Sequence, residues 1–382
     1  MSRQPLRLGM IGGGEGAFIG AVHRMAAALD GEWRLTAGAF STDIGRNGRT
    51  GEQLGLDPQR VYGSVDKMLA AEAALPAAAR IDAVAIVTPN HLHASMAIAA
   101  LRAGFHVFCE KPMAMSVAEA EAIAEAAQAS GRRFALAFTY SGYPLVEEAR
   151  ARVARGDFGA VRLVQVEYLQ GWLSQPIDTD GNKQAEWRTD PARAGLGGCL
   201  GDIGTHAFHL AEHVSGLRTE ALSAELSIHV PGRRLDDDVS ALLRFDGGAR
   251  GTLKASQVAA GEENGLKLRV HGERGGLEWS QMEPNTLTLR WLDRPAEIVR
   301  ANGPGLQQST TGLLRIPAGH PEGYVEAFAN LYRAFAAAIR GDGEGWFPGV
   351  PDGLRTMKFV EAVVTNAAAD QKWTKIESGE KS

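Results

Sequence analysis

Hydrophobic and polar residues along the first 140 positions change repeatedly between two patterns. Residues 81–87 are apolar except for Asp82, which is typical of a strand buried on both faces of a sheet. Residues 17–29 instead repeat apolar side chains near helical spacing. The alternation predicts strands at 6–11, 35–40, 81–87, 107–109 and 134–138, and helices at 17–29, 51–54, 65–74, 92–103 and 117–129. Strands that alternate with helices indicate βαβ units, so we expect a doubly wound parallel sheet over residues 1–140.

Beyond residue 140 the pattern becomes a succession of strands. Asp246-Gly247-Gly248 is a favourable hairpin turn, and consecutive hairpins indicate an antiparallel sheet. The pattern predicts strands at 161–170, 221–230, 239–245, 249–256, 266–271, 276–279 and 287–291, helices at 146–155, 197–215, 324–339 and 350–370, and a loop at 303–320. We therefore expect a second, α+β domain over residues 141–382, with a last helix that can pack back on the first domain.

Composition narrows the class of protein. A chain of 382 residues with 45% hydrophobic and 22% charged residues has the profile of a two-domain globular enzyme. Its net charge of −5 argues against a nucleic-acid partner, and it contains no apolar stretch long enough to span a membrane. The N-terminus does not resemble a signal peptide, and the chain has only two cysteines, Cys109 and Cys199. We expect a cytoplasmic protein.

A glycine-rich turn follows the first predicted strand. Gly12-x-Gly14-x-x-Ala17 fits the G-x-G-x-x-G/A fingerprint, in which glycines permit a tight turn and a close approach of the backbone to a pyrophosphate. The helix that begins here would add N-terminal amides that attract phosphate. We expect a dinucleotide to contact Gly12, Gly14, Glu15, Gly16, Ala17 and Phe18.

The end of the second predicted strand bears on the choice between NAD and NADP. An acid there would bond the ribose 2′-hydroxyl of NAD, but this chain has Phe40 followed by Ser41. Ser41, Thr42 and Arg46 could hold a 2′-phosphate, while Asp43 could reach a ribose. The preference stays open, with a slight lean to NADP.

Two further turns end buried strands at the edge where open α/β sheets bind ligands. Thr88, Pro89 and Asn90 follow the strand at 81–87, and Asn90 can bond a ribose or a carboxamide. His93 could do the same or help to cap the next helix.

Glu110-Lys111-Pro112 follows the strand at 107–109. Lys111 is a candidate for proton relay, and Glu110 for orienting Lys111 or a ribose.

A glycine-rich segment leads into the predicted helix at 197–215. Asp202 and His206 are four residues apart and would share one helix face. Histidine is the natural proton acceptor near neutral pH. His209 and His213 continue the stripe, which leaves open a metal site, although no HExxH pattern or cysteine cluster supports it. We expect no metal.

These motifs resemble the Gfo/Idh/MocA oxidoreductases over nearly the whole chain. The resemblance rests on the glycine turn, Thr-Pro-Asn-His-Leu-His at 88–93, Glu-Lys-Pro at 110–112, Trp187-Arg188, Gly-Gly-Cys-Leu-Gly-Asp-Ile-Gly-Thr-His at 197–206 and Asp237-Asp238. It implies a Rossmann domain followed by an open, mostly antiparallel sheet whose outer face commonly forms dimer or tetramer contacts. It also implies oxidation of a ring hydroxyl of a sugar or cyclitol, or reduction of the ketone.

The resemblance assigns roles to individual residues. His206 would be the acid/base, Lys111 would polarise the reacting oxygen, and Asp202 would orient the substrate. Trp187 and Arg188 would line the pocket or touch the cofactor, and Tyr140 and His320 are further pocket candidates. Many members have an acid at the position of Phe40 and an Asn near Thr139-Tyr140. This chain departs from the family at both places, which bear on cofactor choice and on that part of the pocket.

Three alternatives accompany this hypothesis. Some relatives use a tightly held NAD to cleave glycosidic bonds without net redox change. A dinucleotide-binding sensor would lack turnover, although the intact set of Lys111, Asp202 and His206 argues against it. A metal hydrolase is the third.

Overall fold

The computed structural model describes residues 4–343 and 345–377, which form two compact units. Of the described residues, the first unit contains 4–139, 328–343 and 345–354, and the second contains 140–327 and 355–377. The first unit thus takes a segment from the C-terminal part of the chain. The domain limits 1–140 and 141–382 stay a prediction.

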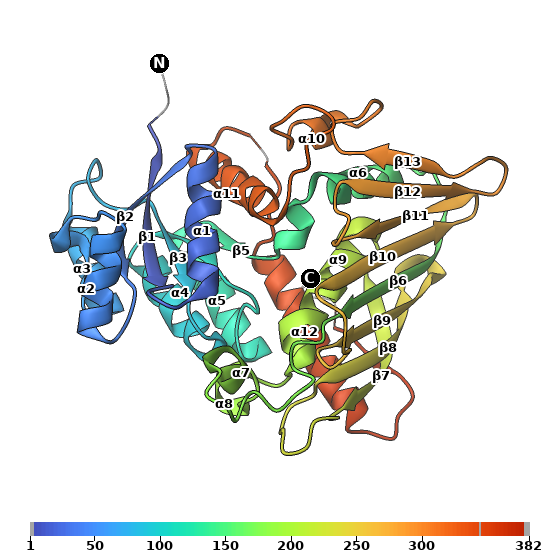
Figure 1. Ribbon diagram of the computed structural model, residues 1–382, viewed down its shortest axis with the longest axis horizontal. Helices are drawn as coiled ribbons and strands as arrows, with labels where there is room; N and C mark the ends of the chain where they lie inside the picture. The colour runs from blue at the N-terminus through green and yellow to red at the C-terminus, as the bar shows by residue number, and fades with distance from the viewer. Residues whose placement is uncertain (1–3, 344, 378–382) are drawn as a thin grey trace. The chain divides into compact units, whose positions relative to one another are not determined.

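The first unit is built on a parallel sheet with the strand order β2-β1-β3-β4-β5 (Figure 1). Its strands are β1 (Leu6–Gly12), β2 (Trp33–Ala39), β3 (Ala83–Val87), β4 (His106–Cys109) and β5 (Phe134–Leu136). Every residue of β3 is buried, as expected for a strand covered on both faces. The predicted doubly wound parallel sheet is confirmed.

Helices cover this sheet on both faces. They are α1 (Phe18–Leu29), α2 (Ile44–Gln53), α3 (Val65–Ala74), α4 (His93–Arg102), α5 (Val117–Ser130) and α11 (Tyr324–Arg340). The Phe108 ring of β4 stacks on Tyr332 of α11 with centroids 4.2 Å apart, and Trp33 of β2 stacks on Phe335 at 5.6 Å. These aromatic contacts explain why the C-terminal part of α11 belongs to the first unit.

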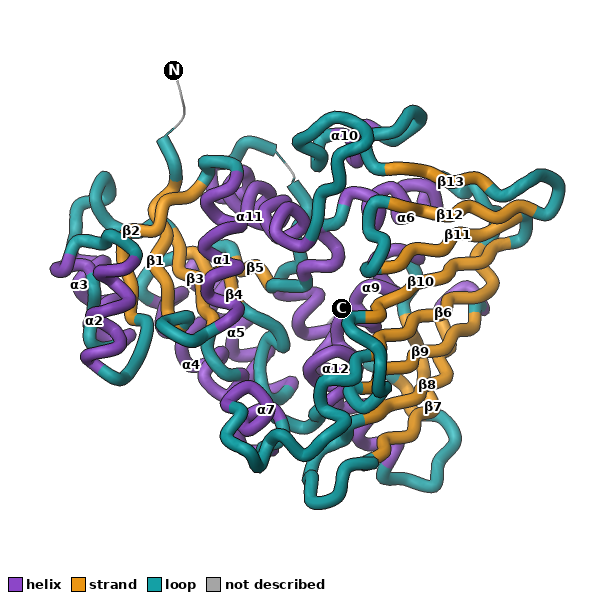
Figure 2. Tube along the Cα trace, in the orientation of Figure 1, coloured by secondary structure: helices purple, strands orange, loops and turns teal. Residues whose placement is uncertain are grey.

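The second unit contains a larger sheet, drawn in orange in Figure 2, with the order β13-β12-β11-β10-β6-β9-β8-β7-β14. Its strands are β6 (Val161–Leu169), β7 (Thr219–Ser227), β8 (Asp238–Phe245), β9 (Arg250–Ser256), β10 (Gly265–Gly272), β11 (Gly275–Ser280), β12 (Thr286–Trp291), β13 (Glu297–Arg300) and β14 (Thr374–Lys375). Within this larger sheet, as far as the structure describes it, only β6 and β9 pair in parallel, and the other neighbouring strands are antiparallel. The predicted, mostly antiparallel sheet is confirmed.

One face of this sheet holds the core of the second unit. It is covered by α6 (Pro144–Ala154) and α9 (Thr205–Ser215), and Phe208 of α9 stacks on Phe359 of α12 (Val350–Ala367) at 4.0 Å. The other face is largely polar, with cross-strand ion pairs such as Lys254 to Asp238. The first residues of α12, up to Leu354, belong to the first unit. There Gly353 lies against Met113.

Several short elements were not predicted. They are the helices α7 (Lys183–Arg188), α8 (Pro191–Ala194) and α10 (Gln308–Thr311) and the strands β13 and β14. The helix α10 lies within the segment 303–320 that was predicted as a loop. Helix α2 begins at Ile44, well before the predicted 51–54, because the Asp43 side chain caps it by accepting the Arg46 N–H. Such elements are too short or too polar to show apolar periodicity.

Candidate functional site

The glycine turn of the first unit joins β1 to α1. Gly12 has a φ of +81°, and a Cβ there would lie 2.8 Å from the Val87 carbonyl oxygen, so only glycine fits. Gly20, inside α1, approaches the turn so closely that a Cβ would lie 2.4 Å from Gly13 Cα. Gly20 was not predicted as a site residue, and its signal in the sequence is a glycine within the first turn of a mostly apolar helix.

Arg24 holds the backbone of this turn in place. Its guanidinium donates to the Gly13 carbonyl oxygen at 2.8 Å. Because the C=O and N–H of a trans peptide point in opposite directions, the Gly14 N–H is directed away from Arg24. The N-cap of α1 is Ala17, which has no side-chain group to cap it, and the first turn contains no acid. These features fit the pyrophosphate of a dinucleotide.

Glu15 and Phe18 lie at the exposed rim of the turn. Glu15 accepts from Arg49 of α2 at 3.0 and 3.1 Å, and its backbone N–H donates to Thr50 Oγ1 at 3.1 Å. The Phe18 side chain is 71% exposed and therefore available to a bound ligand.

The end of β2 is occupied by a buried aromatic side chain. Phe40 is 3% exposed, and its N–H donates to Asn47 Oδ1 at 2.7 Å. Ser41 Oγ accepts the Asp43 N–H at 3.1 Å, and the Asp43 carboxylate accepts the Arg46 N–H at 2.7 Å. This backbone hydrogen bond lowers the pKa of Asp43. Ser41 and Asp43 thus help to turn the chain into α2.

The turn after β3 carries Thr88 and Pro89, which are partly exposed, and Asn90, which is buried. His93 is fully buried, with Nδ1 2.8 Å from the Pro112 carbonyl oxygen and Nε2 2.9 Å from that of Thr88. Burial lowers the pKa of His93. The imidazole therefore links the turn after β3 to the turn after β4.

Glu110 and Lys111 follow β4. Glu110 is buried, and its Oε1 lies 2.9 Å from His23 Nε2, while its Oε2 accepts the Lys111 backbone N–H at 3.1 Å. Burial alone would raise the pKa of Glu110, but the hydrogen bond from His23 and the charge of Lys111 lower it overall. Glu110 is therefore an anion held beside Lys111.

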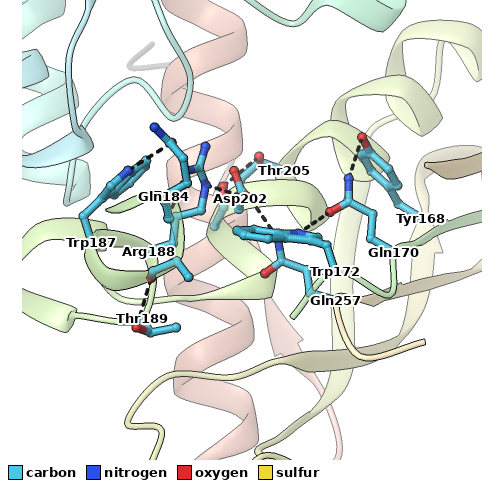
Figure 3. A network of polar contacts seen from close by, with 12 residues as sticks. Tyr168, Gln170, Trp172, Gln184, Trp187, Arg188, Thr189, Asp202, Thr205 and Gln257 are labelled. Atoms are coloured by element: carbon cyan, nitrogen blue, oxygen red, sulfur yellow. Dashed lines mark hydrogen bonds and ion pairs between the residues drawn. The ribbon is translucent and has the colours of Figure 1, made fainter. Parts of the chain in front are cut away.

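A polar network in the second unit surrounds Asp202 (Figure 3). The carboxylate accepts from Gln257 Nε2 at 2.8 Å and from Arg188 Nε at 3.2 Å. The Arg188 guanidinium lies 4.2 Å from the Trp187 ring centroid and 5.9 Å from that of Trp172. Trp187 and Arg188 were predicted from the sequence, whereas Trp172 and Gln257 were not.

His206 contacts a second group of polar side chains in the same unit. Its ring packs edge-on against Tyr140 at 4.8 Å and Tyr168 at 6.3 Å. The two tyrosine hydroxyls bond each other, and Asn264 bonds both, at 2.6 Å to Tyr168 and 3.2 Å to Tyr140. Burial raises the pKa of Tyr168 well above its usual value, so this phenol stays protonated.

Gln170 continues this group toward Trp172. It donates to Asn264 Oδ1 at 2.8 Å. It also accepts from Trp172 Nε1 at 3.0 Å (Figure 3). These residues were missed because they come from β6 and the segments that follow β6 and precede β10, which carry no recognisable motif. The structure brings them together with the predicted Tyr140 and His206.

The helix that carries Asp202 and His206 is not a uniform α-helix. Residues Leu200–Gly204 form a π-helical turn, and α9 begins at Thr205. Such turns are frequent at functional sites. The segment is anchored by Asp236, whose carboxylate accepts the N–H groups of Gly198 and Leu200, each at 2.7 Å. Burial raises the pKa of Asp236 to about 6.

The remaining predicted residues lie elsewhere. The rings of His209 and His213 stack on each other at 5.7 Å along α9. Among residues 4–343 and 345–377, no three His, Cys, Asp or Glu side chains are grouped so as to hold a metal ion. His320 lies exposed, with Nδ1 3.2 Å from the Pro317 carbonyl oxygen, and its pocket role stays a prediction. No helix in the described ranges is long and apolar enough to cross a membrane.

Comparison with known proteins shows which family has this combination of parts. Residues 6–138 match the oxidoreductase family model with an NAD-binding Rossmann fold, and residues 146–278 match the GFO/IDH/MocA C-terminal domain. The chain belongs to the Gfo/Idh/MocA oxidoreductase family. It is 32% identical to the uncharacterized oxidoreductase YfiI of Bacillus subtilis strain 168, over 97% of this chain and 96% of that one.

Two further relatives have named ligands or substrates. Levoglucosan dehydrogenase of Pseudarthrobacter phenanthrenivorans is 28% identical, and the match covers 98% of each chain. The structure of an inositol dehydrogenase homologue from Azotobacter vinelandii with NADH and myo-inositol has a TM-score of 0.91 and 37% identity, covering 97% of this chain and 98% of that one. This Gfo/Idh/MocA member is therefore an NAD-binding oxidoreductase with sugar and cyclitol dehydrogenases among its relatives.

Proposed function

We propose that this enzyme transfers hydride between a nicotinamide cofactor and a secondary ring hydroxyl, or the ketone, of a sugar or cyclitol. The observation that carries the proposal is the cluster in the second unit. It places a histidine beside two phenols and an amide, Tyr140, Tyr168 and Asn264, which are groups suited to hydroxyls. Relatives named for levoglucosan and crystallised with myo-inositol support a neutral polyol as substrate.

In the second unit, His206 is the proposed acid/base. An imidazole can accept the hydroxyl proton near neutral pH and return it in the reverse direction. Asp202 is proposed to orient the substrate, and its own position is fixed by Arg188 and Gln257. Trp187 is proposed to line the pocket, and Tyr140 and His320 are further proposed substrate contacts.

In the first unit, Lys111 is proposed to stabilise negative charge on the reacting oxygen. The cofactor, when bound, supplies the carbon that accepts or donates the hydride. Residues proposed to hold it are Gly12, Gly14, Glu15, Gly16, Ala17, Phe18, Ser41, Thr42, Arg46, Thr88, Pro89, Asn90, His93, Glu110, Lys111 and Arg188. The side chain of His93 is buried, so His93 would support the cofactor site by bonding the backbone of Thr88 and Pro112.

The edge after β2 supports acceptance of NADP. No acid stands at Phe40, Arg46 lies in the first turn of α2, and Arg49 lies about one turn further along the helix. Arginine forks suit phosphate. We expect Arg46→Ala to lower kcat/KM with NADP more than with NAD, and an equal loss with both cofactors would contradict this assignment.

A homodimer or homotetramer formed through the outer face of the larger sheet is also proposed. Light scattering after size-exclusion chromatography tests it, and a monomer would refute it. The cytoplasmic location stays a prediction.

Absorbance at 340 nm tests the proposed reaction. Purified protein is mixed with NAD or NADP and a panel of ring polyols that includes myo-inositol and levoglucosan. Growth of absorbance with one polyol supports a dehydrogenase and identifies the preferred cofactor. If the absorbance changes with none of the polyols although cofactor binding is confirmed, the result would favour a redox-neutral glycosidase or a sensor instead.

Variants then test the two proposed catalytic residues. We expect His206→Asn to lower kcat about 10²–10⁴-fold, the usual contribution of general acid–base catalysis, with cofactor affinity unchanged. Lys111→Ala should behave similarly. The exposed His229 provides the matched control, since His229→Asn should leave turnover intact. Normal turnover of His206→Asn would refute the assignment.

A further inference from the structure

Three buried side chains of the first unit form a chain of hydrogen bonds that ends beside Lys111. Tyr332 OH lies 2.7 Å from His23 Nδ1, and His23 Nε2 lies 2.9 Å from Glu110 Oε1. The other carboxylate oxygen of Glu110 accepts the Lys111 backbone N–H at 3.1 Å. The chain therefore connects α11, α1 and the end of β4.

The direction of these hydrogen bonds follows from the chemistry of the groups. The pKa of Glu110 is lowered by His23 and Lys111, so its carboxylate is ionised and can only accept. Nε2 of His23 must then carry a hydrogen in either charge state of the ring. Burial raises the pKa of Tyr332 well above its usual value, which keeps its hydroxyl protonated and able to donate to Nδ1.

The surroundings of the chain exclude water and restrict its motion. The His23 ring is fully buried and packs edge-on against Phe108 at 5.8 Å and Phe328 at 4.6 Å. Tyr332 is 1% exposed and stacks on Phe108. Hydrogen bonds in such an apolar cage are stronger than in water, and leaving one of their groups unpaired is costly.

The turn that bears Lys111 is held on its other side as well. His93 bonds the Pro112 carbonyl oxygen, so residues 110 and 112 each contact a buried imidazole while Lys111 lies between them. The sequence motif contains the lysine but gives no indication of His23 or Tyr332, which are far from it along the chain.

We propose that Tyr332 and His23 are positioning residues that fix Glu110 and thereby place the Lys111 ammonium for reaction. The inference rests on the catalytic role proposed above for Lys111. It extends that role to a buried chain whose first member lies in α11, a C-terminal helix.

Tyr332→Phe is the sharpest test because it removes one hydroxyl and keeps the stacked ring. The matched control is Tyr62→Phe, since Tyr62 OH donates to Glu72 Oε1 at 2.8 Å elsewhere in the same unit. Both variants lose one tyrosine–protein hydrogen bond. We expect only Tyr332→Phe to lower kcat. A displacement of a catalytic group by about 1 Å can lower the rate about a hundredfold, so a smaller displacement of the Lys111 ammonium should lower kcat about tenfold. KM and cofactor affinity should stay within about twofold.

A second readout does not depend on the substrate. Competitive labelling with acetic anhydride, followed by peptide mass spectrometry, measures the reactivity of Lys111 relative to the exposed Lys67 as a function of pH. Tyr332→Phe should shift the labelling profile of Lys111 and leave that of Lys67 unchanged, whereas Tyr62→Phe should alter neither. Glu110→Gln, which keeps the side-chain size, should shift the Lys111 profile further.

The outcomes separate this inference from the proposed function. If Lys111→Ala abolishes turnover while Tyr332→Phe and Glu110→Gln match Tyr62→Phe in kcat and labelling, the positioning chain is refuted and the catalytic lysine stands. If Lys111→Ala retains normal turnover, the proposed role of Lys111 is refuted, and the inference is refuted with it.

Discussion

Asp236→Asn tests how the segment that carries Asp202 and His206 is held. The carboxylate accepts two backbone N–H groups, from Gly198 and Leu200, with one oxygen each. An amide offers only one acceptor oxygen, so the substitution leaves one buried N–H without its partner. That loss costs about 1–3 kcal/mol.

The loss of stability in Asp236→Asn depends on pH, because the Asp236 carboxyl binds a proton and the amide does not. Burial raises the pKa of Asp236 to about 6, against about 3.9 for an unfolded aspartate. The folded protein therefore holds this proton more tightly, and the resulting stability is complete below about pH 4 and is lost as the pH rises through about 6. Between pH 7.5 and 4.5 the wild type should gain about 2 kcal/mol from this group. The asparagine variant cannot gain it.

Urea unfolding of both proteins at the two pH values measures the effect. The difference in unfolding free energy, wild type minus Asp236→Asn, should be larger by about 2 kcal/mol at pH 4.5 than at pH 7.5. Leu235→Ala is the control, because it destabilises a neighbouring buried site without removing a proton-binding group. A difference that stays constant, or grows toward pH 7.5, would refute the reasoning.

Three other substitutions have direct consequences. Gly20→Ala forces its new Cβ to within 2.4 Å of Gly13 Cα, so dinucleotide affinity measured by fluorescence should fall while the second unit stays folded, and unchanged affinity would contradict the close approach. Gln257→Leu removes the 2.8 Å hydrogen bond to Asp202, and steady-state kinetics should show a raised KM for the polyol, whereas an unchanged KM would argue against the orienting role of Asp202. Phe40→Ala should cost about 3–5 kcal/mol in thermal or urea unfolding, and a loss below about 1 kcal/mol would show that the site collapses around the cavity.

Apolar periodicity was sufficient for most of the architecture. A strand such as β3 is buried on both faces and therefore reads as an almost continuous apolar run, and a hairpin such as β8–β9 carries its own turn residues. Elements stabilised by capping or by distant contacts had no such signal. Helix α2 depends on the Asp43 cap, and the C-terminal part of α11 joins the first unit through aromatic stacking on Phe108 and Trp33.

The residues of the candidate site also fall into those that sequence motifs identified and those that only the structure revealed. Motifs identified the glycine turn, Lys111, Asp202 and His206, because backbone geometry and proton transfer require particular residue types at fixed local spacings. The chain by itself thus determined the chemistry it can offer. Only the tertiary structure decided what holds these groups in place: Tyr332 and His23 behind Glu110, Asp236 beneath the π-helical turn, and Asn264 beside Tyr140. Those contacts join residues that are far apart in sequence, and hydrogen bonds between such residues leave no periodic pattern in the chain.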